Sequence, residues 1–226
     1  MDGRRVAYLQ AMGLDVWLER GAPVPAWPQA TPCAGGGVAA LDWAGLEARV
    51  RGCRDCALHR TRTQTVFGVG NRQARWMIVG EAPGADEDRR GEPFVGRAGR
   101  LLDAMLRAIG LSREEVYIAN ILKCRPPENR DPRPDEVGHC EGYLGRQVDL
   151  ISPAVILAVG RVAAQNLLKT QTTIGRLRGA VHRLPGSDIP VVVTYHPAYL
   201  LRSPAEKGKA WADLKLACRI AQDTEG

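Results

Sequence analysis

Four short apolar runs, separated by segments with helical periodicity, constrain the fold of this chain more than any other feature of its sequence. The runs occupy residues 76–80, 116–121, 154–160 and 190–195. Runs of this length and composition are typical of strands buried on both faces. Helical patterns lie near residues 97–109, 135–151, 161–168 and 207–221. The alternation predicts an α/β fold, a three-layer α/β/α sandwich around a central four-stranded, mostly parallel sheet.

The chain divides into three predicted parts. Residues 41–226 form the α/β domain, which begins with a helix carrying Leu46 and Val50 on one side and capped by Asp42. Residues 21–40 contain four prolines, four glycines and no charged residue, which is typical of a linker. Residues 1–20 carry a short helical pattern and a few apolar side chains with no core of their own, so they are predicted to be a docking peptide.

Charge and segment lengths limit the partners of the chain. Lys and Arg outnumber Asp and Glu by 31 to 25 among 226 residues, and the net charge of +6 favours a polyanionic partner. A long apolar span and a secretory leader pattern are both missing from the sequence, so we expect a cytoplasmic protein that does not bind membranes. Clustered thiols in a reducing compartment are better read as metal ligands or redox groups than as disulfides.

Four of the six cysteines are spaced as metal ligands. Cys53 and Cys56 form a CxxC pair, while Cys124 and Cys140 bracket a proline-rich segment that has little to bury. Ligation would fix such a segment where apolar packing cannot. Four thiolates suit either tetrahedral zinc or a [4Fe–4S] cluster, and spacing alone does not choose between them.

The segments that follow the predicted strands carry the candidate site residues, because ligands of parallel sheets gather beyond the carboxyl ends of the strands. Residues 80–99 form a loop rich in glycine and acids, in which Phe94 offers a stacking face or a core contact. The phosphate-binding motifs GxxxxGK[ST] and GxGxxG do not occur there, and Glu81 would repel a phosphate. Asn120 ends the second strand, where its amide suits either a base edge or a turn cap.

The fourth strand leads into TYHPAYLLR, residues 194–202. His196 could donate a hydrogen bond to charge that develops on a leaving group, or serve as a half-buried structural histidine. Arg202 could contact a phosphate or belong to a solvated face.

These segments together resemble a known family. GEAPGADED with PFVGRAG, ANILKCRPPENR and TYHPAYLLR, in this order and with the four cysteines, closely resemble family 4 uracil-DNA glycosylases over about residues 41 to 222. The resemblance implies an enzyme of base excision repair that hydrolyses the bond between uracil and deoxyribose in single- or double-stranded DNA. It also implies a structural [4Fe–4S] cluster held by the four cysteines, Cys53, Cys56, Cys124 and Cys140.

The resemblance assigns roles to single residues. Phe94 would stack on the extruded uracil, Asn120 would bind its pyrimidine edge, and His196 would stabilise the uracil oxygen that gains charge. Glu81, with backbone at Gly80 and Ala82, would shape the water site. Where a better-known branch of the superfamily has an aspartate, this chain has Ala82, so Glu81 is the first candidate for a general base and Glu87 the second.

The loop after His196 would contact DNA. Relatives push a side chain from this region into the duplex, so the resemblance implies DNA contacts by Tyr199, Leu200 and Arg202. Some iron–sulfur relatives carry a histidine-containing insertion after the second strand and bond covalently to the uracil site. The segment KCRPPENRDPRP has no histidine, which favours turnover by water.

Residues 8–21, YLQAMGLDVWLERG, resemble the amino-terminal peptide of the psi subunit of the bacterial clamp loader, which docks on the chi subunit. The resemblance implies chi as a partner of the docking peptide, and the alternative is that these residues pack on the catalytic domain. Two other readings of the whole chain stay open: a non-catalytic iron–sulfur DNA-binding replication accessory, and a zinc-ribbon nucleic-acid module.

Overall fold

The computed structural model describes residues 37–223. The predicted docking peptide and residues 21–36 of the predicted linker lie outside this range. The last linker residues, Val38–Ala40, form a 3₁₀ helix (η1), and Val38 packs against the buried cluster that contains Leu46 and Tyr143. The folded domain therefore includes residues that the sequence analysis assigned to the linker.

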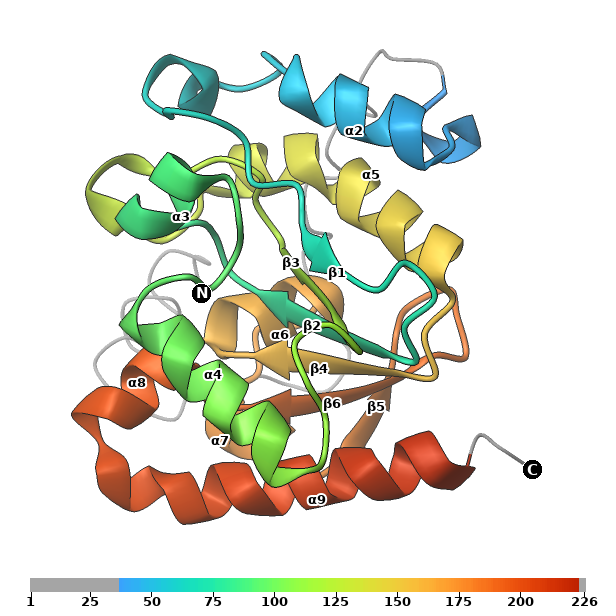
Figure 1. Ribbon diagram of the computed structural model, residues 1–226, viewed down its shortest axis with the longest axis vertical. Helices are drawn as coiled ribbons and strands as arrows, with labels where there is room; N and C mark the ends of the chain where they lie inside the picture. Colours follow the sequence, from blue (N-terminus) through green and yellow to red (C-terminus); the bar gives the residue numbers. More distant parts are fainter. Residues whose placement is uncertain (1–36, 224–226) are drawn as a thin grey trace, which may run out of the picture. The chain divides into compact units, whose positions relative to one another are not determined.

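A single six-stranded sheet forms the centre of the described domain, in the order β1-β3-β2-β4-β6-β5 (Figure 1). The strands are β1 Val69–Gly70, β2 Trp76–Gly80, β3 Tyr117–Asn120, β4 Val155–Val159, β5 Val181–Arg183 and β6 Pro190–Thr194. The four inner strands are parallel to one another, while β1 and β5 pair antiparallel at the two edges.

The four predicted strands are confirmed as β2, β3, β4 and β6, and the predicted sandwich is confirmed as well. Nearly every side chain of these strands is buried, which explains why each reads as a continuous apolar run. The count of four was too low because both edge strands are short. A strand of two or three residues shows no period that a sequence pattern could reveal.

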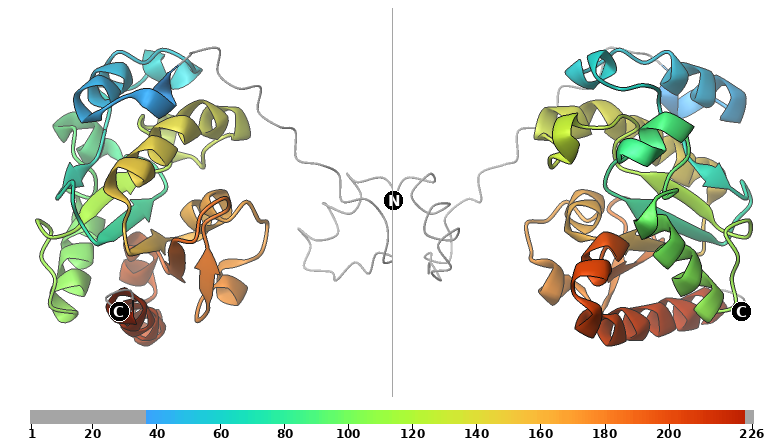
Figure 2. Two further views of the ribbon diagram at one scale, coloured as in Figure 1. Left: turned by 90° about the vertical axis from the view of Figure 1, so that its right-hand side faces the viewer. Right: turned by 60° about the vertical axis from the view of Figure 1, so that its left-hand side comes forward.

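Helices cover both faces of the sheet (Figures 1 and 2). The α-helices are α2 Trp43–Arg51, α3 Ala85–Arg90, α4 Arg97–Ala108, α5 Pro134–Ile151, α6 Arg161–Leu167, α7 Ile174–Leu177, α8 Pro197–Arg202 and α9 Lys207–Asp223. Three further 3₁₀ helices are η2 Ala57–Arg60, η3 Pro127–Asn129 and η4 Pro204–Glu206. The predicted helices in α2, α4, α5, α6 and α9 are confirmed, and Asp42 caps α2 by accepting a hydrogen bond of 2.8 Å from the N–H of Gly45.

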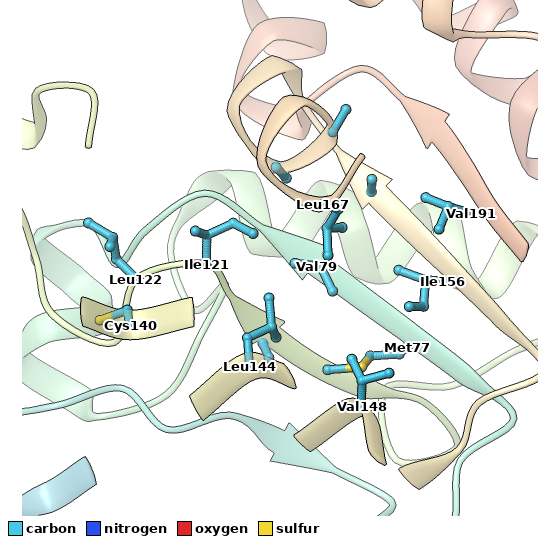
Figure 3. Packing of buried hydrophobic residues seen from close by; sticks show 14 of the residues in the cluster. Met77, Val79, Ile121, Leu122, Cys140, Leu144, Val148, Ile156, Leu167 and Val191 are labelled. Atoms are coloured by element: carbon cyan, nitrogen blue, oxygen red, sulfur yellow. The ribbon is translucent and has the colours of Figure 1, made fainter. Parts of the chain in front are cut away.

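Two apolar cores lie on opposite faces of the sheet. Met77 and Val79 of β2 face α5 and α6, where Leu144, Val148 and Leu167 cover them (Figure 3). Successive strand residues point to opposite faces, so Ile78 faces the other core, which is built by α4, α8 and α9. This double cover leaves the carboxyl ends of the inner strands as the place where polar residues can gather.

A third, smaller cluster joins α2 to α5. It consists of Leu46, Val50, Cys53 and Tyr143, all buried. The chain leaves α2 directly into the CxxC segment, so this packing sets the position of Cys53 and Cys56 relative to α5. None of the helices between residues 37 and 223 has the length and apolar content needed to cross a membrane.

Candidate functional site

The carboxyl ends of the four parallel strands meet at one edge of the sheet, and three of the predicted site residues lie there. Gly80 is the last residue of β2 and pairs in register with Asn120, the last residue of β3. His196 follows β6 by two residues, and Gly160 follows β4. This edge is the part of a parallel sheet at which ligands bind.

Gly80 allows Phe94 and Asn120 to approach each other. A β-carbon at position 80 would lie 2.4 Å from Oδ1 of Asn120 and 2.7 Å from Cε2 and Cζ of Phe94. A β-carbon essentially never comes this close to an atom to which it is not bonded, so any side chain at this position would displace both groups. Gly80 is therefore required by space, and the amide and the aromatic ring converge above it.

Phe94 adopts an uncommon backbone conformation. Its φ of 54° lies in the left-handed region, which costs free energy for a bulky residue and persists only where neighbours enforce it. The guanidinium of Arg113 donates hydrogen bonds to the carbonyl oxygens of Pro93 and Phe94, the second at 3.2 Å. The backbone of α4 also passes so close that a β-carbon on Gly99 would meet the Phe94 carbonyl at 1.7 Å.

Glu87 holds the same loop from its other side. Its carboxylate accepts hydrogen bonds from the N–H groups of Val95 at 2.9 Å and of Gly84 and Gly96 at 3.1 Å. Both carboxylate oxygens are thus engaged with backbone. This role positions the Phe94 loop and leaves Glu87 poorly placed to act as a general base.

His196 is next to Phe94, and its hydrogen bonding fixes its tautomer. Its Nδ1 accepts a hydrogen bond of 3.1 Å from the N–H of Ala198, so the proton of the neutral ring resides on Nε2. Burial, with a smaller contribution from the Arg202 guanidinium, lowers the pKa of His196 from 6.5 to about 4. The imidazole is therefore neutral near pH 7 and presents one N–H donor.

The imidazole and the aromatic ring are in contact. The ring centroids of Phe94 and His196 are 5.6 Å apart, and the ring planes differ by 29°. Gly160, with a φ of 101°, gives the histidine room, because a β-carbon there would lie 3.0 Å from Cβ of His196.

Asn120 carries an acceptor without a partner. Its side chain is 3% exposed, and in the described part of the chain no donor reaches Oδ1. A buried amide oxygen that lacks a hydrogen bond costs free energy, which a ligand with a suitable N–H would recover. This buried acceptor is therefore available to a ligand at the edge of the sheet.

Glu81 and Ala82 follow directly after Gly80. Burial, and to a lesser extent the nearby Asp131 carboxylate, raises the pKa of Glu81 to about 7, while Arg161 opposes this shift. A carboxyl group with this pKa can exchange protons near neutral pH. Ala82 is half-buried and packs against the core that faces α5.

The three predicted DNA-contacting residues lie on α8 but differ in exposure. Tyr199 is 36% exposed and Arg202 is exposed, whereas Leu200 is 1% exposed and belongs to the core beneath α4. A side chain in that core cannot enter a duplex while α8 stays folded. The exposed apolar neighbour is Leu201, at 37%, which sequence reasoning passed over because helical phase cannot be assigned within so short a helix.

The four predicted ligand cysteines line one pocket. Cys53 and Cys56 lie between α2 and η2, Cys124 follows β3, and Cys140 lies on α5. Arg62 crosses the pocket wall, donating to Sγ of Cys124 at 2.9 Å and to the carbonyl of Cys53 at 2.7 Å. Residues that are far apart in sequence therefore bring four thiols to one pocket, while their role as metal ligands stays a prediction.

Four thiols at one pocket are a donor set that suits either zinc or a [4Fe–4S] cluster. Within residues 37–223, no group of three or more His, Cys, Asp or Glu side chains is placed to hold a single metal ion. Burial raises the pKa of Cys140 to about 12, and such a thiol ionises only when a metal offsets the buried charge.

One residue near the pocket escaped sequence reasoning. Lys123 is 1% exposed and donates from Nζ to the carbonyl oxygen of Asn120 at 3.0 Å and to Oε1 of Gln147 at 2.6 Å. Lysine is almost never fully buried, so composition gave no reason to expect it inside. Its position directly before Cys124 was the only available signal.

Comparison with known proteins shows a consistent set of relatives. A family model described as "Uracil DNA glycosylase superfamily" matches residues 67–215. A type-4 uracil-DNA glycosylase of Archaeoglobus fulgidus is 51% identical over 172 residues, which are 74% of this chain and 86% of the relative.

Pyrobaculum aerophilum has relatives of two types, and this chain is more similar to the type-4 protein than to the type-5 protein. Its type-4 uracil-DNA glycosylase is 40% identical over 182 residues, covering 78% of this chain and 93% of the relative. Its type-5 uracil-DNA glycosylase is 32% identical over 148 residues, covering 58% of this chain and 64% of the relative. The names of these relatives give no support to the predicted clamp-loader chi partner of residues 8–21.

Proposed function

The chain belongs to the uracil DNA glycosylase superfamily and is an enzyme of uracil-excision DNA repair, and from this premise we propose how its residues release uracil. The substrate is uracil-containing DNA, the products are free uracil and an abasic site, and water is the second reactant. The observation that carries this proposal is the convergence of Phe94, Asn120 and His196 at Gly80 and the edge of the sheet.

Recognition begins with extrusion of the uracil from the base stack, since its glycosidic bond cannot be reached inside a duplex. Phe94 stacks on the extruded ring. The unpartnered Oδ1 of Asn120 accepts the N3–H of uracil, and the amide N–H donates to O4. Cytosine has no hydrogen on N3 and would leave this buried oxygen unpaired, at a cost of about 1–3 kcal/mol.

Bond cleavage requires stabilisation of a negative charge. As the C1′–N1 bond breaks, its electron pair moves to the uracil ring and increases the charge on O2. The neutral His196 donates its Nε2–H to that oxygen. A preorganised donor of this kind contributes on the order of 3 kcal/mol to the transition state.

Water completes the reaction by adding to C1′. The oxygen of water forms the new C1′–O bond and one of its protons leaves, while the uracil anion takes up a proton from solvent to become free uracil. Glu81 is the proposed acceptor of that proton, because it lies beside Gly80 and its pKa of about 7 leaves much of it ionised at neutral pH. Gly80 and Ala82, on either side of Glu81 in the sequence, are the residues whose backbone we propose to border the water site.

We further propose that Cys53, Cys56, Cys124 and Cys140 hold a [4Fe–4S] cluster. Support comes from the four thiols that line one pocket and from the similarity to type-4 uracil-DNA glycosylases. When bound, such a cluster ties the CxxC segment to the segment after β3 and to α5 through iron–thiolate bonds. These residues therefore hold in place the elements that carry Asn120.

DNA would lie across α8. Tyr199 and Arg202 are the exposed members of this helix that we propose contact DNA, the first by stacking and the second by binding a phosphate. Leu200 instead supports the helix from below.

A uracil-release assay tests the proposed function. The wild-type protein should free uracil from a labelled single-stranded oligonucleotide and leave the matched thymine oligonucleotide intact. A protein that binds both oligonucleotides but frees no uracil would instead be the non-catalytic accessory. Visible absorbance of the purified protein that is bleached by dithionite supports the cluster, and a colourless zinc protein would contradict it.

A further inference from the structure

The buried Lys123 lies between the thiol pocket and the base-reading residue Asn120. Its ammonium donates to the Asn120 carbonyl oxygen and to Gln147, as described above. Lys123 also lines the thiol pocket, together with Cys124 and Cys140. Lys123 thus contacts Asn120 through the end of its side chain, and in the sequence it directly precedes the pocket residue Cys124.

Lys123 holds one side of a peptide group that carries Asn120. The carbonyl of Asn120 and the N–H of Ile121 belong to the same planar peptide unit. Lys123 binds the carbonyl, and the N–H donates to the carbonyl oxygen of Gly80 at 2.9 Å. Anchoring both ends of this unit fixes its plane, and with it the direction in which the Asn120 side chain leaves the strand.

Gln147 anchors the ammonium to α5, two helical turns beyond Cys140. Its side chain is 0% exposed, and its amide donates to the carbonyl of Phe67 at 2.9 Å and to the hydroxyl of Tyr117 at 3.0 Å. The acceptor oxygen of the amide is therefore held toward Lys123. A shift of α5 would be transmitted to Asn120 through these hydrogen bonds.

We propose that Lys123 is a positioning residue that couples the thiol pocket to uracil recognition by fixing the Asn120 peptide. This inference rests on the proposed function, because it assigns Asn120 the task of reading the base. It predicts that a change at Lys123 affects uracil binding only through Asn120.

A double-mutant cycle tests this coupling. Lys123→Met keeps most of the length of the side chain but removes its charge and its donors. Its affinity for free uracil, measured by calorimetry, should fall about tenfold, the effect of one lost hydrogen bond from a charged group. In an Asn120→Ala background the same change should have no further effect on affinity.

Three controls make the result interpretable. Lys215→Met, at an exposed position of α9, should bind uracil as the wild type does. Visible absorbance and the thermal midpoint report whether Lys123→Met still carries its metal and its fold. The inference fails if the absorbance and the thermal midpoint of Lys123→Met fall in proportion to its uracil binding. It also fails if the effects of Lys123→Met and Asn120→Ala on uracil affinity multiply. In either case Lys123 has only a structural role.

A second variant decides the question if Lys123→Met does not fold. Gln147→Leu keeps Lys123 but removes the hydrogen-bond acceptor that holds its ammonium to α5. This variant should bind uracil more weakly than the wild type. In the Asn120→Ala background the same change should have no effect on uracil binding. Unchanged binding in Gln147→Leu would overturn the inference. A wild-type protein that frees no uracil would instead overturn the proposed function, so the two failures are distinct.

Discussion

The ring of Phe94 and the imidazole of His196 lie against each other, with centroids 5.6 Å apart, although they come from the segments after β2 and β6. Phe94 keeps this place with a strained backbone held by Arg113. A stacking surface and a hydrogen-bond donor are thus set side by side before any ligand binds. Preorganisation of this kind lowers the cost of reaching the transition state.

Replacement of the donor should slow the chemical step. We expect His196→Ala to reduce the single-turnover rate of uracil release about 100- to 1,000-fold, the range seen when one such donor is removed. His182→Ala is the matched control, because His182 is also half-buried but lies on the edge strand β5. Equal loss of rate in both variants would contradict the assigned role of His196.

The pH dependence of the rate should report on Glu81. Its pKa is raised to about 7 by burial and by Asp131, so its basic form is lost as the pH falls through that value. The single-turnover rate should therefore drop below about pH 7 in the wild type. In Glu81→Gln the rate should be lower and this drop should disappear. A wild-type profile that stays flat through pH 7 would remove Glu81 as the base.

His196 should make the fold sensitive to acid. Its folded pKa of about 4 lies below the ordinary value of 6.5, mainly through burial, with Arg202 lowering it further and Glu87 opposing. The unfolded chain therefore binds the proton first, and stability falls as the pH drops from about 6.5 to 4. The free energy of unfolding of His196→Asn, measured by urea titration, should depend less on pH over this interval. An unchanged slope would place the acid sensitivity elsewhere.

Substitution of Gly80 tests whether the close packing of Asn120 and Phe94 is needed for activity. The β-carbon of Gly80→Ala would overlap Oδ1 of Asn120 and the Phe94 ring, so the site must open. Displacement of reacting groups by about 1 Å costs about 100-fold in rate, which we expect for uracil release by this variant. Gly145→Ala adds the same methyl group on α5 where nothing lies within 4 Å, and it should retain full activity.

Loss of one ligand thiol should remove the proposed cluster. Cys140→Ala, at a buried position of the pocket, should lose most of its visible absorbance and bound iron and unfold at a lower temperature. Cys218→Ala, on α9 outside the pocket, should keep both properties. Full iron content in Cys140→Ala would contradict the ligand set.

The inner sheet was predictable because each of its strands is buried on both faces. Burial of this kind leaves a continuous apolar run such as residues 154–160, which became β4. The edge strand β5 gave no such signal, since Val181 and Arg183 are exposed. Helix α3 was missed although its sequence carries the usual marks, with Asp86 at its start and the left-handed Gly91 at its end.

The sequence indicated which residues to consider for the candidate site better than it indicated how their side chains are arranged. Asn120 ends β3, and Phe94 and His196 lie in the segments after β2 and β6, so their convergence could be anticipated from the parallel sheet. The burial of Leu200 could not, because a six-residue helix has too few residues for its phase to be read. Lys123 was missed for a different reason, because only a folded network of Gln147 and backbone makes a buried ammonium tolerable.

The short outer strands have a consequence for behaviour at high concentration. A sheet edge is a template on which another chain can add a strand, and a long apolar edge invites aggregation. Here the edge strand β1 is only two residues long and the opposite edge strand β5 only three. The longer apolar strands, which would be the best templates, are paired on both sides. We therefore expect the described domain to resist the addition of a further strand at either edge of its sheet.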